Sequence, residues 1–129
     1  MVSNSSRADS MLVISCLALD EARPNPDEFC VSLVIANEPN VFIRVYDGYL
    51  QLDPVYNPRK PETFHKDASF YLRRNSYFPG YITLESVRQP GLYVRATAGG
   101  KMKIDLFQDT YEFRNAASFT SLDHSSRRT

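Results

Sequence analysis

Tryptophan is absent from this chain of 129 residues, and cysteine and histidine occur only twice each. Fifteen lysines and arginines balance fifteen aspartates and glutamates, so the chain has no net charge that would attract a nucleic-acid backbone. Cys16 and Cys30 are too few for a disulfide framework and lack the paired spacing of a zinc site, although one bridge between them remains open. We therefore expect no nucleic-acid partner, no metal and no cofactor.

Long hydrophobic runs are also lacking. The run from Met11 to Leu19 is too short to cross a bilayer, which needs about 20 apolar residues, so we expect no membrane partner. The run is either a buried strand or helix of the domain, or the apolar part of a secretory signal. Arg7 supplies the only positive charge before it and Asp9 opposes that charge, so the signal is weak. The localisation, secretion included, stays undecided.

The apolar residues that are present alternate with polar ones at the period of a strand. Val31, Leu33 and Ile35 show this alternation, and residues 41–45 repeat it. Proline or glycine interrupts every candidate helix, and turn formers separate the apolar segments. Because single domains commonly have about 100–150 residues, the pattern predicts one all-β domain.

An internal repeat is the strongest signal in the chain. Residues 30–75 and 81–120 carry the same blocks in the same order: Ser-Leu or Thr-Leu, then Pro-x-x-(Phe/Tyr)-(Ile/Val)-Arg, then an alternating segment ending in Asp, then Phe-x-x-x-Ala-Ser-Phe. We expect the two copies to stack through a shared core. Its predicted members are Leu33, Ile43, Leu52, Phe64 and Phe70 in the first copy, and Leu84, Val94, Ile104, Phe113 and Phe119 in the second.

This order of blocks resembles the repeat of the arabinose-binding (AbfB-type) module of α-L-arabinofuranosidases. The resemblance implies a β-trefoil, in which three repeats close around a pseudo-threefold axis and each can form a shallow pocket for arabinofuranose. Two repeats are clear here, so the third is either missing or a degenerate unit within residues 1–29, and residues 121–129 form a polar tail. Two repeats alone would leave strand edges and apolar surface open, which a degenerate unit or self-association would cover.

The resemblance also implies which residues would contact a sugar. The family commonly has a His directly after the Leu-Arg pair, but apolar residues follow Arg44 and Arg95 here, so that His is missing from both copies. Asp67 matches the Asp of the family's closing signature, whereas Ala116 replaces it in the second copy, where Asn115 stands beside it. The expected carbohydrate-binding residues are therefore Asp67 and Asn115.

Structural alternatives exist for these residues. Asp67 is also suited to bond the backbone amides of a turn or cap. For Arg44 and Arg95 we expect a structural salt bridge or stacking over an aromatic ring. His65 and His124 lack the partners of a catalytic triad or metal cluster, and no pair of acidic residues is recognisable as that of a glycosidase. We expect no catalytic residue.

The sequence thus predicts a non-catalytic carbohydrate-binding module for arabinose-containing polysaccharide or oligosaccharide, with pocket residues partly lost. One alternative is a protein-interaction module on the same fold, and another is a fragment of an enzyme with α-L-arabinofuranosidase activity. Six tyrosines that we expect to be exposed suit sugar stacking and protein contacts equally well. These are Tyr46, Tyr49, Tyr56, Tyr71, Tyr77 and Tyr81.

Overall fold

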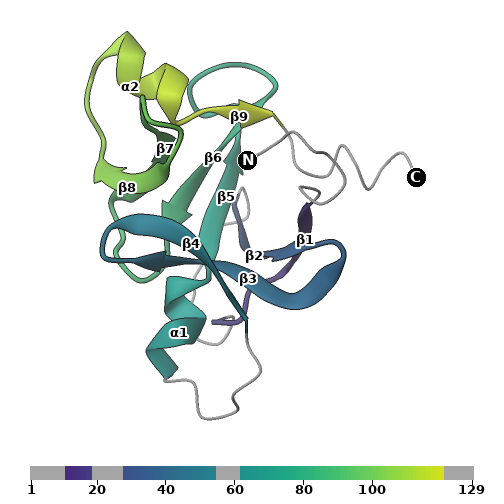
Figure 1. The fold of residues 1–129 in the computed structure, drawn as a ribbon. Coiled ribbons are helices and arrows are strands. Elements are labelled where there is room, and N and C mark those ends of the chain that lie inside the picture. The colour runs from purple at the N-terminus through teal and green to yellow at the C-terminus, as the bar shows by residue number, and fades with distance from the viewer. Residues whose placement is uncertain (1–10, 19–27, 55–61, 121–129) are drawn as a thin grey trace.

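A computed structural model describes residues 11–18, 28–54 and 62–120 of the chain (Figure 1). The predicted all-β class is confirmed, because strands make up most of the regular structure and each of the two helices has six residues. In chain order the elements are β1 (Met11–Ser15), β2 (Glu28–Ile35), β3 (Glu38–Tyr46), β4 (Tyr49–Pro54), α1 (Glu62–Asp67), β5 (Phe70–Arg74), β6 (Tyr81–Ser86), β7 (Leu92–Ala96), β8 (Met102–Leu106), α2 (Tyr111–Ala116) and β9 (Phe119–Thr120).

The strands form a closed barrel. Seven of them pair in the order β2-β3-β4-β8-β7-β6-β5, and β5 pairs back onto β2, with Glu28 opposite Arg73 and Val31 opposite Phe70. Strands β1 and β9 lie outside this ring and pair with β2 and β6. The predicted β-trefoil-like fold is therefore wrong. Because the edge strands β2 and β5 pair with each other, the ring closes without a third unit. Strands of both copies of the repeat thus belong to one seven-strand barrel.

The β3–β4 hairpin positions residues that become important for the site. Tyr46 lies opposite Tyr49, so the loop consists of Asp47 and Gly48, with φ angles of 55° and 82°. A two-residue loop with positive φ at both positions matches the right-handed twist of the strands, and Asp-Gly is among the sequences that adopt it readily. This local chemistry fixes the register in which Ile43 faces Leu52.

Most of the predicted core lies inside the barrel. Six predicted residues belong to one buried cluster: Leu33, Ile43, Phe70, Leu84, Val94 and Ile104. Phe119 packs against this cluster, and Phe64 and Phe113 are each 1% exposed but lie outside it. The prediction for Leu52 is wrong, because its side chain is 57% exposed. It follows Leu50 on the same face of β4, at a place where both side chains line a cavity that opens to solvent.

Two helices replace the extended chain that we expected in the closing blocks. In α2, the Thr110 side chain accepts a hydrogen bond from the Phe113 amide at 3.0 Å, which satisfies one of the free donors at the helix start. Each helix buries one phenylalanine: α1 buries Phe64 and α2 buries Phe113. Six residues span less than two turns, so a helical period has no room to appear in the sequence.

The N-terminal apolar run contributes a strand to the sheet. β1 pairs antiparallel with β2 from Met11 opposite Ile35 to Ser15 opposite Val31. The run therefore includes a strand of the domain, as the first interpretation expected, but this strand is not fully buried, because Ile14 is 38% exposed. Leu19, Tyr56 and His124 fall outside the described residues. Within the described parts of the chain, no helix has the length and apolar character needed to cross a membrane.

Candidate functional site

Arg44 of β3 organises a cluster of charged side chains beside α1. Its guanidinium donates hydrogen bonds to Asp53 Oδ2 at 2.9 Å and to Asp67 Oδ2 at 2.5 Å. The same group lies 5.1 Å from the centre of the buried Phe64 ring. The expected salt bridge and stacking of Arg44 are therefore confirmed. Ring contact and two ion pairs together fix the orientation of a side chain that is only 15% exposed.

Asp67 lies at the C-terminal end of α1 and is 8% exposed. One of its oxygens accepts from Arg44, and the other accepts from Arg88 at 2.9 Å. Within the described residues its side-chain partners are thus arginines, and not the backbone amides of a turn or cap. A carboxylate has about four lone-pair positions, so about two remain for another donor.

These side chains line an open cleft of about 690 Å³. The cleft lies between β3 with its hairpin turn, the end of α1 and the loop after β6. Its charged lining residues are two arginines, Arg44 and Arg88, and two aspartates, Asp47 and Asp67. Tyr46, which is 59% exposed, adds an aromatic ring 5.5 Å from the Arg44 guanidinium. The cleft combines donors, acceptors and a ring face without an excess of either charge.

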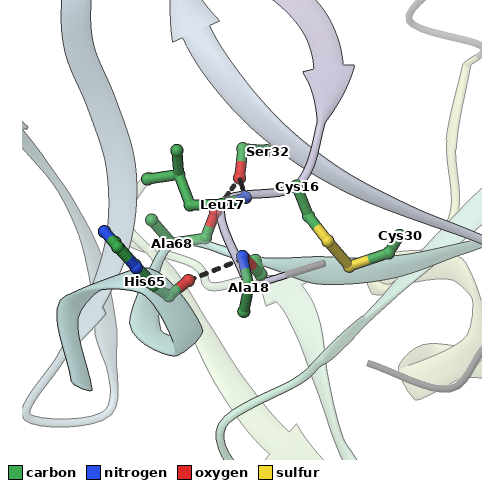
Figure 2. Close-up of a disulfide and its surroundings, with 8 residues drawn as sticks. Cys16, Leu17, Ala18, Cys30, Ser32, His65 and Ala68 are labelled. Carbon is green, nitrogen blue, oxygen red and sulfur yellow. Dashed lines mark hydrogen bonds between the residues drawn. A yellow bond between two sulfur atoms is a disulfide. The ribbon is translucent and has the colours of Figure 1, made fainter. Parts of the chain in front are cut away.

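A disulfide supports the helix that carries Asp67. Cys16, directly after β1, bonds to Cys30 of β2 with a Cα–Cα distance of 5.3 Å, which settles the pairing that the sequence left open. Figure 2 shows this disulfide with the following turn, Leu17 and Ala18, beside His65 and Ala68. The bridge therefore ties the chain after β1 to the barrel next to α1.

Two buried serines connect this turn to α1. Ser32 Oγ accepts from the Leu17 amide at 3.1 Å and donates to the Ala68 carbonyl at 2.6 Å. Ser69 Oγ accepts from the Ala18 amide at 3.1 Å and donates to the His65 carbonyl at 2.6 Å. Both serines have no exposed surface. We call the disulfide, residues 16–18 and these two serines the strap, because together they hold the end of α1 from which Asp67 projects.

The second copy of the repeat, residues 81–120, forms a related but weaker arrangement. Arg95 of β7 lies 5.6 Å from the Phe113 ring centre and pairs with Asp105 at 3.5 Å, so its expected structural contacts are also confirmed. Asn115 is exposed on α2 and does not line the Asp67 cleft. Figure 1 places α1 and α2 at different ends of the barrel, so the structure does not bring Asp67 and Asn115 together.

Arg88 is the site residue that sequence reasoning missed. It follows β6 and therefore belongs to the second copy of the repeat, yet its guanidinium completes the cluster around Asp67 of the first copy. Aligning the two copies of the repeat on Pro39 and Pro90 puts Asn37 opposite Arg88. The two residue types differ, so the repeat gave no reason to expect a site residue at this position. Only the pairing of strands in space brings this arginine to the cleft.

Aromatic side chains gather near α2. Tyr77 packs on Phe107 and Phe113, with ring centres 5.8 and 6.5 Å away. Burial raises the pKa of Tyr77 above its ordinary value of 10.0, and the neighbouring Tyr93 raises it further.

In the described ranges no group of three or more His, Cys, Asp or Glu side chains is arranged to bind a metal ion.

Comparison with curated proteins identifies two human relatives. Otogelin is 32% identical over 117 residues, which cover 90% of this chain and 4% of otogelin. Otogelin-like protein is 28% identical over 90 residues, which cover 70% of this chain and 4% of that protein. The chain therefore spans about 4% of the length of these two relatives.

Solved structures with the same fold include two arabinofuranosidases. A mutant GH54 α-L-arabinofuranosidase soaked with 4-nitrophenyl α-L-arabinofuranoside has a TM-score of 0.63 at 22% identity, covering 70% of this chain and 19% of that one. An arabinofuranosidase complexed with arabinofuranosyl-α-1,2-xylobiose has a TM-score of 0.65 at 20% identity, covering 76% of this chain and 20% of that one. Residues 22–121 match the α-L-arabinofuranosidase B (ABFB) domain, and the chain belongs to this domain family.

Proposed function

We propose that this domain binds a neutral, arabinofuranosyl-containing saccharide in the cleft beside Asp67 and carries out no reaction on it. The observation that carries the proposal is the cluster of Arg44, Asp67 and Arg88, in which a fixed carboxylate stands between two guanidinium groups at the wall of an open cleft. The volume of about 690 Å³ lies within the range of about 300–1,000 Å³ that small-molecule sites commonly have.

The chemistry of the lining favours a sugar hydroxyl pair as the ligand group. Each hydroxyl donates one hydrogen bond and accepts others, so it can donate to Asp67 and accept from Arg88, whose side chain is 41% exposed. Two arginines and two aspartates among the lining residues balance, which favours a neutral ligand over an anion. The exposed ring of Tyr46 offers an apolar face for the carbons of the sugar.

One site, and not two, is what we infer for the chain. Asp67 is the residue that matches the closing Asp of the family, and in the second block Ala116 stands in its place. Asn115 is therefore retained only as a weaker candidate. Two solved relatives were studied with arabinofuranosyl compounds, so this chemical class is the first to test.

Isothermal titration with arabinofuranosyl-xylobiose tests the proposal. We expect one site per chain, and at least about tenfold weaker binding for Asp67→Asn, because a hydrogen bond to a charged group contributes about 1.5–3 kcal/mol. Asp67→Asn also weakens two ion pairs, so Tyr46→Ala serves as a second variant that leaves the core intact and is expected to bind several-fold more weakly.

Tyr111→Ala is the matched control for Tyr46→Ala. Tyr111 is 66% exposed and lies on α2, away from the cleft, so its removal should leave the affinity unchanged. Absence of heat with the folded protein, or equal losses in Tyr46→Ala and Tyr111→Ala, contradicts the proposal. An aryl arabinofuranoside should not be hydrolysed, and turnover would show that the domain is more than a binding module.

Exposed apolar side chains next to α2 favour a second candidate, a protein-contact role. Leu106, Phe107 and Tyr111 are 63%, 44% and 66% exposed and are close in sequence. Such a concentration of apolar and aromatic surface is typical of protein interfaces. If this surface pairs with a second copy, sedimentation velocity will show association that Tyr111→Ala weakens. A chain that stays monomeric at all concentrations removes self-association from consideration.

A further inference from the structure

A second cavity, of about 500 Å³, lies at one mouth of the barrel and shares no lining residue with the Asp67 cleft. Buried core residues such as Leu33, Ile43 and Leu84 form its floor. Leu50, Leu52 and Met102 are among the residues of its wall. The exposure of Leu52, which the alternating pattern predicted to be buried, follows from this opening. The barrel therefore presents apolar surface to solvent at a concave place, where an apolar chain would lose its contact with water.

Two lysines lie near this cavity, and one of them, Lys101, lines it. The ammonium groups of Lys101 and Lys103 lie 5.6 and 5.7 Å from the centre of the Tyr49 ring, and Tyr49 and Lys101 are both lining residues. Within the described residues, neither lysine takes part in an ion pair, since the pairs formed there join other side chains. Both ammonium groups thus contact one aromatic ring, and no carboxylate of the described ranges pairs with either of them.

We propose that this cavity binds a single-chain anionic amphiphile of the fatty-acid class. The hydrocarbon chain lies in the cavity against Leu50, Leu52 and Met102, and the carboxylate accepts a hydrogen bond from Lys101. Lys103 does not line the cavity, but it contacts the same Tyr49 ring and adds positive charge nearby. Burial of the chain provides the hydrophobic contribution, at about 25 cal/mol per Å² of apolar surface removed from water. The carboxylate balances the Lys101 charge, which has no ion-pair partner within the described residues, and this selects an anionic headgroup.

The same charges disfavour a second copy of the chain as the occupant. A symmetric contact through this mouth would place the lysine pairs of both copies close together, and like charges facing each other across an interface oppose association. A partner without negative charge would likewise leave both lysines unbalanced. An anionic amphiphile matches both features of the cavity, because its chain contacts the apolar wall and its carboxylate binds the lysine.

Titration with sodium decanoate below its micelle concentration tests this proposal, with decan-1-ol and decylammonium as comparison ligands. We expect decanoate to bind at least about tenfold more tightly than decylammonium, because its carboxylate gains charge-assisted hydrogen bonds that an ammonium group cannot form. The double variant Lys101→Met with Lys103→Met should lose the preference for decanoate over decanol. Leu52→Glu, which places a carboxylate in the wall, should abolish decanoate binding.

Two controls separate this result from a loss of folding or a general charge effect. Leu106→Glu adds the same charge at another exposed leucine and should leave decanoate binding unchanged, as should Lys66→Met on α1. Circular dichroism establishes that each variant is folded. Equal binding of decanoate and decylammonium, or no binding of decanoate by the folded protein, overturns the proposal. A dimer that Leu52→Glu dissociates also overturns it, because a second copy then occupies the mouth.

Discussion

Arg44 with helix α1 (the Arg44 region) and Arg95 with helix α2 (the Arg95 region) have the same local arrangement, but only the first forms the candidate site. In both, an arginine on a strand stacks over the buried phenylalanine of a short helix, at 5.1 Å from Phe64 and at 5.6 Å from Phe113. Arg44 also pairs with Asp67 of its helix, whereas the corresponding helix position in the Arg95 region is Ala116. The shared contacts are therefore structural, and the Asp67 carboxylate, with the Arg88 that it binds, distinguishes the candidate site from its counterpart.

The support behind the two helices differs as well. In the Arg44 region, Ser69 Oγ donates to the His65 carbonyl and also accepts from the Ala18 amide of the strap. In the Arg95 region, Ser118 Oγ makes the matching bond to the Arg114 carbonyl at 2.7 Å, and the described residues contain no disulfide beside it. The helix that carries the carboxylate is thus the one that the fold restrains more strongly.

Removing the disulfide should have the largest effect on this difference. The Cys16 to Cys30 bridge closes a loop with a sequence separation of 14, for which chain entropy predicts about 3 kcal/mol of stabilisation. We expect Cys16→Ser with Cys30→Ser to lower the free energy of unfolding by about that amount in urea denaturation. Sugar affinity should fall in the fraction that remains folded. A loss below about 1 kcal/mol would show that the strap contributes little.

Replacing each arginine by methionine compares the two charge clusters directly. Arg44 is 15% exposed and bonds two aspartates, so Arg44→Met should lower the free energy of unfolding by about 2 kcal/mol, since each of these nearly buried carboxylates loses an ion pair. Arg95 is 24% exposed and its pair with Asp105 is long, so Arg95→Met should cost about 0.5–1 kcal/mol. Equal losses in parallel urea titrations would remove the distinction between the regions.

The sequence predicted the common part of these regions better than the part that makes them differ. Alternation predicted the strands, and the matching positions of Arg44 and Arg95 predicted a salt bridge or ring stacking for both, without identifying the ring. Closure of the barrel by β2 and β5 could not be predicted, because alternation shows which face of a strand is buried and not which strand pairs with it. The role of Arg88 depends on that same closure, and this is why the cluster around Asp67 was found only in part.

The two serines offer a smaller comparison. Ser69→Ala removes the acceptor of the Ala18 amide and leaves a buried donor without a partner, which should cost about 1–2 kcal/mol. Ser118→Ala removes one bond to a helix carbonyl in a partly exposed place and should cost about 0.5 kcal/mol. Thermal unfolding of the two variants measures the difference. A larger loss from Ser118→Ala would mean that the strap does not restrain α1.

Alkaline pH should affect the Arg95 region slightly through Tyr77. Because its pKa in the folded chain is raised, mainly by burial, folding favours the neutral phenol, and this contribution is complete below about pH 10 and is lost as the pH rises through the folded value. We expect the stability of Tyr77→Phe to decline less steeply above about pH 10 than that of the natural chain. Identical slopes in urea titrations between pH 8 and 11 would contradict this assignment.

Amide chemical shifts during titration with arabinofuranosyl-xylobiose test the central claim most directly. If the Arg44 region alone forms the sugar site, the amides of Arg44, Asp67 and Arg88 will shift together and saturate at one ligand per chain, while those of Arg95 and Asn115 stay in place. Shifts that saturate at Asn115, with or without those at Asp67, would contradict the account, because the carboxylate would then not be what separates the two regions.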